Sequence, residues 1–311
     1  MPRPLRPADA DALLALWNRS ARYDPLTPAL LAEKVWEDPG FDPALGLVDE
    51  AGGALVAFGM GVLWGPPNQT RGTVKLLCTA PERRREGRAG AILARLEAEL
   101  AARGAVAVRV AESSPNYLVP GVDVRYTPGW LFVQKHGYAQ VGEAVNMHVD
   151  LRADPHAAGG GAWATAPREA ELAARGLTVR RAAPSDRGAV RAFLGRHWPA
   201  WIPEVEATFG RDPAALHLAL DGDAVVGFSA HDANNRGTGW FGPMGTDPER
   251  RGLGVGAVLC RRCLADMAAA GRTAATIPWV APVGFYAHHA GAHVSRVFHR
   301  FEKALPRSST P

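Results

Sequence analysis

Two short turns that combine arginine with glycine carry the residues best suited to binding chemistry in this chain. Residues 81–93 read PERRREGRAGAIL, and residues 248–260 read PERRGLGVGAVLC. Aligned on their prolines, the two copies match Arg84 with Arg251, Gly87 with Gly254, and Ala89 with Gly256. Glycine lets a backbone approach a ligand closely, and successive N–H groups at the start of a helix bind anions. With the fixed charge of the arginine added, each turn predicts a site for a pyrophosphate.

Other interpretations of the turns fit the sequence less well. Gly252, Gly254 and Ala257 satisfy the dinucleotide-binding pattern G-x-G-x-x-A, which should open a βαβ domain and precede an acidic residue at a strand end. Here the glycines come well into the unit, and the downstream strand at 274–280, AATIPWV, has no acidic residue. The absence of G-K-[ST] argues against a P-loop. Duplication argues against chance glycines in a surface turn.

Each turn is expected to lie between a strand and an amphipathic helix. The strand-like runs are TVKLLCT at 73–79 and GWFGPMGT at 239–246. Periodicity predicts that the helices end near Gly104 and Gly271. Their expected apolar faces are Ile92, Leu93, Leu96 and Leu100 in the first, and Val255, Val258, Leu259 and Cys263 in the second. The units also begin alike, with an R-x-A-x-x-D opening before an apolar helix, so the chain is expected to be a tandem repeat.

The length and composition agree with two globular domains. A chain of 311 residues is about twice a typical domain, and 47% hydrophobic residues with 21% charged ones are ordinary for globular proteins. The segment 151–167, LRADPHAAGGGAWATAP, is rich in Gly, Ala and Pro and suits an exposed linker. We therefore expect an N-terminal unit at 1–152, a linker at 153–175 and a C-terminal unit at 176–311.

Charge and cysteine content limit the partners and the compartment. A net charge of +4 is too small to indicate nucleic acid or an anionic membrane. Cys78, Cys260 and Cys263 do not make a disulfide framework, which favours a reducing cytoplasm. Cys260 and Cys263 form a CxxC inside a helical pattern and are expected to be small core residues. No apolar run is long enough for a signal peptide or a membrane span.

The sequence P-x-x-R-G-x-G-x-G between a strand and a helix resembles the acyl-CoA-binding motif of the GNAT acetyltransferases. Arg251, Gly252, Gly254 and Gly256 complete the motif in the second unit. The first unit departs from it with Arg85, where the family favours Gly, and with Ala89. The resemblance implies two tandem GNAT-like acyl-CoA N-acyltransferase units, each an α/β fold with a mixed sheet and helices on both faces. The layout is similar to that of mycothiol synthases, and the phrases at 115–127 and 279–286 resemble bacterial amino-sugar acetyltransferases.

The same resemblance implies where acetyl-CoA, the expected cofactor, would bind. Backbone amides around Gly252, Leu253, Gly254, Val255 and Gly256 would hold the pyrophosphate. Backbone groups of Met244 and Thr246 would pair with the pantetheine arm and polarise the thioester carbonyl, as an oxyanion hole does. The equivalent positions of the first unit are Leu77, Thr79, Arg84, Gly87 and Ala89.

Amine acetylation needs a base, or a water chain to one, for the amine and an acid for the departing thiolate. The resemblance implies that a tyrosine on the last helix is the acid, and the second unit supplies Tyr286 in FYAHHAGA. The spacing from Tyr286 to Gly291 is one residue longer than the family pattern. The first unit has Val133 in FVQKHGY at the matching place, and a valine cannot donate a proton. The second unit is therefore expected to be catalytic, and the first to be a structural half or a non-catalytic CoA binder.

The general base has no clear position, because GWFGPMGT contains no acidic residue. His231, followed by Asp232, is the base candidate because histidine titrates near neutral pH. Glu204 and Glu206 are alternatives, in a loop that the resemblance places near the acceptor pocket. The adjacent His288 and His289 have no third ligand nearby and do not predict a metal site.

Two groups of aromatic and polar residues fit an acceptor pocket. Trp198 and Trp201 flank prolines and suit stacking on a sugar or an apolar amine, although core packing is the alternative. A polar loop of the first unit either lines a second pocket or packs across the domain interface; it contains Asn116, Tyr117, Asp123, Arg125 and Tyr126.

The function expected from these residues is acetyl transfer from acetyl-CoA to a primary amine of a small molecule, with an amino sugar as one candidate. The reaction would be direct attack, without a covalent enzyme intermediate. Two alternatives stay open: a non-catalytic acyl-CoA-binding or sensing protein, and an acetyltransferase for protein or peptide amines.

Overall fold

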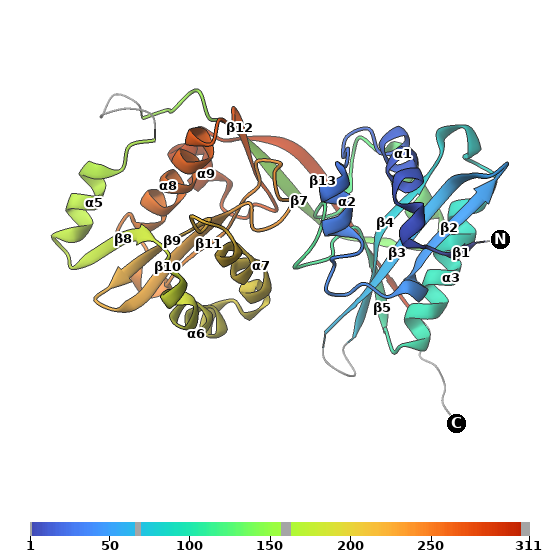
Figure 1. Ribbon diagram of the computed structural model, residues 1–311, viewed down its shortest axis with the longest axis horizontal. Helices are drawn as coiled ribbons and strands as arrows, with labels where there is room; N and C mark the ends of the chain where they lie inside the picture. The colour runs from blue at the N-terminus through green and yellow to red at the C-terminus, as the bar shows by residue number, and fades with distance from the viewer. Residues whose placement is uncertain (1, 66–69, 157–162, 306–311) are drawn as a thin grey trace. The chain divides into compact units, whose positions relative to one another are not determined.

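The computed structural model describes residues 2–65, 70–156 and 163–305. The contacts of the chain divide it into two units, and Figure 1 labels the helices and strands of each. Unit 1 contains residues 1–144 and 297–311, and unit 2 contains residues 145–296. Both are α/β units, as the sequence predicted, with strands and helices in the same order around the repeated turn.

The sheet of unit 1 has the order β1-β2-β3-β4-β5-β13. All neighbouring strands are antiparallel except β4 and β5, which are parallel. Helices α1 and α2 pack with one hydrophobic core cluster, and α3 packs with another. The strands are β1 (Arg3–Pro4), β2 (Gly46–Ala51), β3 (Ala54–Trp64), β4 (Arg71–Thr79), β5 (Ala107–Val110), β6 (Val122–Asp123, paired with β13) and β13 (His293–Ala304). The helices are α1 (Ala10–Ser20), α2 (Pro28–Lys34), α3 (Arg88–Ala102) and α4 (Thr127–Lys135).

Unit 2 repeats this arrangement with a sheet of order β11-β10-β9-β8, antiparallel throughout. The strand β12 pairs with β7 and forms one parallel bridge, Trp240 to Thr276, beside the start of β11. The strands are β7 (Ala139–Asp150), β8 (Leu177–Arg181), β9 (Leu216–Asp221), β10 (Ala224–His231), β11 (Phe241–Thr246) and β12 (Ala274–Ile277). The helices are α5 (Ala166–Ala173), α6 (Arg187–His197), α7 (Ile202–Ala207), α8 (Val255–Ala269) and α9 (Val283–Ala290).

The helices after the two turns, α3 and α8, bury the faces that the sequence predicted. The buried residues of α3 are Ile92, Leu93, Leu96 and Leu100. Helix α8 buries its expected four and also Cys260, Leu264 and Met267, so it is covered over a wider arc. Beyond the helix ends, Gly104 and Gly271 have positive φ of 88° and 79°, a backbone conformation that glycine adopts without strain. All three cysteines are free and buried, and burial raises the pKa of Cys78 and of Cys260 to about 12.

Strand β4 contains a bulge at the point where its pairing with β5 ends. The two strands pair from Arg71 to Val74, where the pairing ends. On the other side of β4 the register with β3 shifts by one residue, which leaves Lys75 as the extra residue. A bulge bends its strand and increases the local twist, so β4 diverges from β5 beyond Val74. In unit 2 the register shifts at the corresponding place, where Gly242 and Pro243 are the residues of β11 inside the irregularity.

The two long strands β7 and β13 each have residues in both units, which differs from the expected boundaries. Residues 302–304 of β13 pair with β5 in unit 1, whereas residues 147–150 of β7 pair with β12 in unit 2. The C-terminal segment therefore lies with unit 1, although the sequence pattern had grouped it with 176–311. The expected linker at 153–175 contains α5, and residues 157–162 of it lie outside the described residues. Within the described residues, no helix is long and apolar enough to cross a membrane.

Candidate functional site

A cavity of about 710 Å³ opens in unit 1 where β4 diverges from β5. Its volume lies in the range of small-molecule and cofactor sites, which is roughly 300–1,000 Å³. The walls come from β4, the repeated turn, the end of β5, the segment after α1, the loop before α4, and α4 itself. Of the expected first-unit positions, Leu77, Thr79, Arg84, Gly87 and Ala89 all line it.

The turn leads into α3 through two residues in the left-handed backbone region. Arg85 has a φ of 68° and Gly87 a φ of 79°. In unit 2 the equivalent residues, Gly252 and Gly254, have φ values of 79° and 91°. The backbone path is therefore conserved between the units, although Arg85 is not the glycine that the family favours. A Cβ added at Gly87 or Gly252 would meet no atom within 4 Å, so neither of these two positions is blocked on its Cβ side.

The unit 1 turn presents cations to the cavity. The side chains of Arg83, Arg84, Arg85 and Arg88 line its mouth, where the N-terminus of α3 adds a partial positive charge. Arg84 donates to the carbonyl of Ser20 at 3.4 Å. Among the described residues, the hydroxyls of Ser20 and Thr79 are buried without a hydrogen-bond partner, and both line the cavity.

The unit 2 turn is covered by side chains from two helices. Arg168 of α5 lies over the N-cap of α8, with its Cδ 3.2 Å from where a Cβ at Gly254 would be. Phe285 of α9 lies 3.4 Å from the corresponding point at Gly256. Arg251 and Gly252 are exposed, whereas Leu253 is half-buried and Val255 buried. Met244 and Thr246 pair with Ser229 and Gly227 on β10.

Tyr286 lies on α9 in an apolar environment. Its side chain is 7% exposed and packs edge-on against Phe241, with the ring centroids 5.8 Å apart. Burial raises the pKa of Tyr286, so the phenol is protonated at neutral pH, as a general acid must be. Val133 of α4, which the sequence pattern matches to Tyr286, is buried in the core of unit 1 and lines its cavity.

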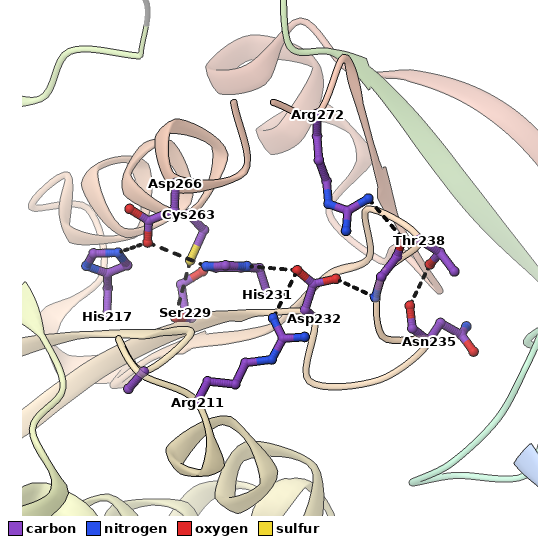
Figure 2. A network of polar contacts seen from close by, with 12 residues as sticks. Arg211, His217, Ser229, His231, Asp232, Asn235, Thr238, Cys263, Asp266 and Arg272 are labelled. Atoms are coloured by element: carbon purple, nitrogen blue, oxygen red, sulfur yellow. Dashed lines mark hydrogen bonds and ion pairs between the residues drawn. The ribbon is translucent and has the colours of Figure 1, made fainter. Parts of the chain in front are cut away.

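His231 is held between two carboxylates (Figure 2). Its Nδ1 lies 3.4 Å from Asp232, and its Nε2 lies 3.4 Å from Asp266 of α8. Burial lowers the pKa of His231, but the two carboxylates outweigh burial and raise it overall. Both ring nitrogens of His231 therefore face carboxylates of unit 2 itself, and its role as general base stays a prediction.

The rest of the network supports Asp266 as an anion. Burial alone would raise the pKa of Asp266, but hydrogen bonds from His217 at 2.7 Å, from His231 and from Arg181 at 2.7 Å hold it far below its usual range. Burial also lowers the pKa of His217 more than Asp266 raises it. The cluster is a buried network of alternating charges, and within the described residues no group of three His, Cys, Asp or Glu side chains is arranged to hold a metal.

The other residues selected from the sequence take varied places. Trp198 and Trp201 stack on each other with centroids 5.4 Å apart. Trp198 also packs so closely on Gly245 that a Cβ there would lie 2.6 Å from the ring. Glu204 is buried in α7, and Glu206 forms an ion pair with Arg191 at 2.5 Å.

The polar loop of the first unit lines the unit 1 cavity, as one of its two interpretations predicted. Asp123 and Tyr126 lie on the cavity wall. Asn116 does not line the cavity; its amide accepts a hydrogen bond from Lys34 Nζ at 2.7 Å and donates one to Asp38 at 3.1 Å.

Sequence reasoning missed two features of the cavity wall. Lys75, the bulge residue, is buried, pairs with Asp38 and donates to the carbonyl of Lys34 at 2.7 Å. Burial lowers the pKa of Lys75, and Asp38 opposes the shift. Asp24 is the second, because it accepts a hydrogen bond from Tyr126 at 2.9 Å. The position of Lys75 inside the apolar run TVKLLCT was a sequence signal that could have identified it. The sequence around Asp24 contains no comparable signal.

Comparison with known proteins identifies a family for part of the chain. Residues 186–291, from the start of α6 to the end of α9, match the model of the acetyltransferase (GNAT) family. The match lies wholly within unit 2, which therefore resembles the domain of this family. No curated protein sequence matches the chain.

Solved structures of similar fold cover both units. A glucosamine N-acetyltransferase region of a fungal multi-domain GH3 β-N-acetylglucosaminidase has a TM-score of 0.79 at 19% identity and covers 97% of this chain, which spans only 38% of that protein. A GCN5-related N-acetyltransferase from Sphaerobacter thermophilus has a TM-score of 0.69 at 20% identity, covering 98% of this chain and 95% of its own. A tandem GNAT protein from the clavulanic acid biosynthesis pathway has a TM-score of 0.69 at 16% identity, covering 98% of both chains. These likenesses confirm the fold, two tandem GNAT-like units.

Proposed function

We propose, from the premise that residues 186–291 match the acetyltransferase (GNAT) family, that the protein transfers an acetyl group from acetyl-CoA to a primary amine of a small molecule. The observation that carries this proposal is the cavity at the repeated turn. It combines an anion-binding helix start and four arginines with a strand, β4, whose pairing with β5 ends at Val74. Bound acetyl-CoA would supply the acetyl group as an activated thioester.

The residues of each turn have a distinct part in holding the donor. The N–H groups at the start of α3 and the side chains of Arg84 and Arg85 would hold the pyrophosphate in unit 1. Leu77 and Thr79, on the free edge of β4, would accept the pantetheine arm. In unit 2, Arg251 and the amides from Gly252 to Gly256 have the same part, and the backbone of Met244 and Thr246 lies on the equivalent strand.

Unit 2 would carry out the transfer with Tyr286 as the acid. A phenol whose pKa is raised by burial holds its proton until a strongly basic group forms beside it, and a departing thiolate is such a group. The backbone N–H groups of β11 would stabilise the charge that develops on the carbonyl oxygen. His231 stays the predicted base for the amine proton, and a water chain to the solvent is the other route.

An amino sugar is the acceptor that we propose to test first. The fungal region of similar fold is described as a glucosamine N-acetyltransferase, and that match supports an amino sugar as a starting point. The paired rings of Trp198 and Trp201, half-buried beside Gly245 of β11, offer apolar surface of the kind on which sugars stack.

The test is the release of CoA thiol from acetyl-CoA in the presence of amines. Glucosamine is the first probe, and N-acetylglucosamine is the matched control because it lacks a free amine. We expect release that depends on glucosamine or another small primary amine. Release of CoA only in the presence of peptides would indicate that the acceptor is an amine of a protein or peptide. Binding of acetyl-CoA without release by any amine would identify a non-catalytic acyl-CoA-binding protein.

A further inference from the structure

A tyrosine and a carboxylate form a hydrogen-bonded pair on the wall of the unit 1 cavity. The phenol of Tyr126, at the start of α4, donates to Asp24 Oδ2 at 2.9 Å, and both residues line the cavity. Asp24 belongs to the segment after α1, where Trp17 Nε1 donates to its backbone carbonyl at 2.7 Å. The pair therefore joins two segments that are about a hundred residues apart in sequence. The hydrogen bond from Trp17 holds the backbone of Asp24 in place.

The phenolic oxygen of Tyr126 has a second partner that favours loss of its proton. The backbone N–H of Tyr23 donates to this oxygen at 2.9 Å. An N–H aimed at the oxygen stabilises the phenolate that remains after the proton has left. The ring of Tyr23 packs edge-on against Tyr126, with centroids 5.1 Å apart, which holds the geometry.

Unit 1 lacks the tyrosine that the resemblance implies on its last helix, because Val133 is in its place. We infer, on the basis of the proposed function, that Tyr126 and Asp24 are the proton-transfer groups of a second acetyl-transfer site in unit 1. This site has the same donor, acetyl-CoA, and a primary amine as acceptor. Unit 1 is thus an active half of the enzyme.

The proton steps balance without another reactant. Asp24 takes the proton that the amine loses as the nitrogen–carbon bond forms. Tyr126 gives its phenolic proton to the sulfur as the carbon–sulfur bond breaks. The proton on Asp24 then passes to Tyr126 along their hydrogen bond, so both groups return to their starting states. The products are the amide and free CoA thiol.

A matched control in the same unit distinguishes a catalytic role of the Tyr126–Asp24 pair from a purely structural one. The phenol of Tyr138 donates to Glu97 Oε1 at 2.8 Å, which is the same kind of bond, and neither residue lines the cavity. Tyr138→Phe should lower stability as Tyr126→Phe does but leave turnover unchanged. Asp24→Asn keeps a hydrogen-bond acceptor for Tyr126 and removes only the carboxylate.

The experiment uses the full chain with Tyr286→Phe, so that the remaining CoA release comes from unit 1. We expect this background to retain amine-dependent turnover. Adding Tyr126→Phe or Asp24→Asn should lower kcat about a hundred-fold, as loss of acid–base catalysis does, with KM for acetyl-CoA little changed. Calorimetric affinity for CoA and the thermal unfolding temperature should match those of Tyr138→Phe in the same background.

Three results would overturn the inference. Loss of all CoA release in Tyr286→Phe alone, or a kcat for Tyr126→Phe equal to that for Tyr138→Phe, would leave the proposed function intact and remove catalysis by this pair. If the unmodified chain releases no CoA with any amine, the proposed function fails, and this inference fails with it.

Discussion

Arg85 and Gly252 occupy the same place in the two repeated turns and have nearly the same backbone conformation, with φ of 68° and 79°. One is a large cation and the other has no side chain, yet both lead into a helix through a second glycine in the left-handed region. The conformation is thus a property of the turn rather than of either residue. Unit 1 keeps it at the cost of a strained arginine, which suggests that the turn is retained for binding.

The turn geometry predicts opposite effects of two substitutions on stability. Gly252→Ala should lower the free energy of unfolding by about 1–2 kcal/mol, because an L-residue is strained at this φ. Arg85→Gly should not destabilise the chain, since it relieves the same strain, but it should weaken CoA binding. Gly188→Ala is the control, because Gly188 lies in α6 with open space around it, and alanine favours helix there. Urea unfolding gives the comparison, and equal losses at 252 and 188 would contradict it.

Tyr286→Phe should lower kcat for amine acetylation and leave acetyl-CoA affinity little changed. Only the phenolic proton is lost, and the apolar packing against Phe241 is kept. If unit 2 carries most of the turnover, kcat should fall about a hundred-fold. Turnover by unit 1 would make the measured fall smaller. The measurement is steady-state CoA release beside a calorimetric titration. A rate equal to that of the unmodified chain would exclude Tyr286 from the mechanism.

The charged network of unit 2 predicts that the cost of replacing His231 depends on pH. Its folded-state pKa is raised, so the stability that it contributes is present below the unfolded pKa of about 6.5 and is lost as the pH rises through the folded value. His231→Asn should therefore cost more stability at pH 5.5 than at pH 9. The groups that face it are Asp232 and Asp266; two arginines complete the network around these carboxylates, Arg211 and Arg181.

His217 in the same network is the control for this titration, with the opposite sign. Its folded-state pKa is lowered by burial, so protonation below pH 6.5 favours the unfolded chain. His217→Asn should cost less stability at pH 5.5 than at pH 9. Thermal unfolding of both variants across this range is the measurement, and parallel curves for the two would contradict the assigned shifts.

The last strand predicts that unit 1 depends on the C-terminal end of the chain. Residues 302–304 pair with β5, and Phe301 is fully buried in the unit 1 core, where a side chain of this kind contributes about 1.5–3 kcal/mol. Ending the chain after Arg296 should unfold or strongly destabilise unit 1, whereas ending it after Leu305 should not. Hydrogen exchange in β4 and β5 reports the effect. Full protection of these strands in the shorter chain would contradict the strand assignment.

Local patterns in the sequence predicted the repeated elements well. The two strand–turn–helix segments, the buried faces of α3 and α8, and the ends of both helices follow from periodicity and glycine placement, which are properties of neighbouring residues. The polar loop around Tyr126 was also identified as a candidate pocket wall, and it lines the unit 1 cavity.

The features that sequence did not predict depend on distant pairing. The hydrogen bond from Tyr126 to Asp24 and the pairing of β13 with β5 join parts of the chain that share no local pattern. The environment of His231 depends on Asp266, which comes from another element and is paired at the same time with His217. The sequence shows that His231 is a titratable residue, but it does not show which charged side chains surround it in the folded chain.

A calorimetric titration of the full chain with acetyl-CoA tests the central claim, that both repeated turns bind the acyl donor. We expect two sites per chain. Arg84→Ala should weaken one and Arg251→Ala the other, each about ten-fold or more, because a hydrogen bond to a charged group contributes ~1.5–3 kcal/mol. Binding at a single site that Arg84→Ala leaves unchanged would contradict the assignment of the unit 1 cavity. The absence of any binding would contradict the account as a whole.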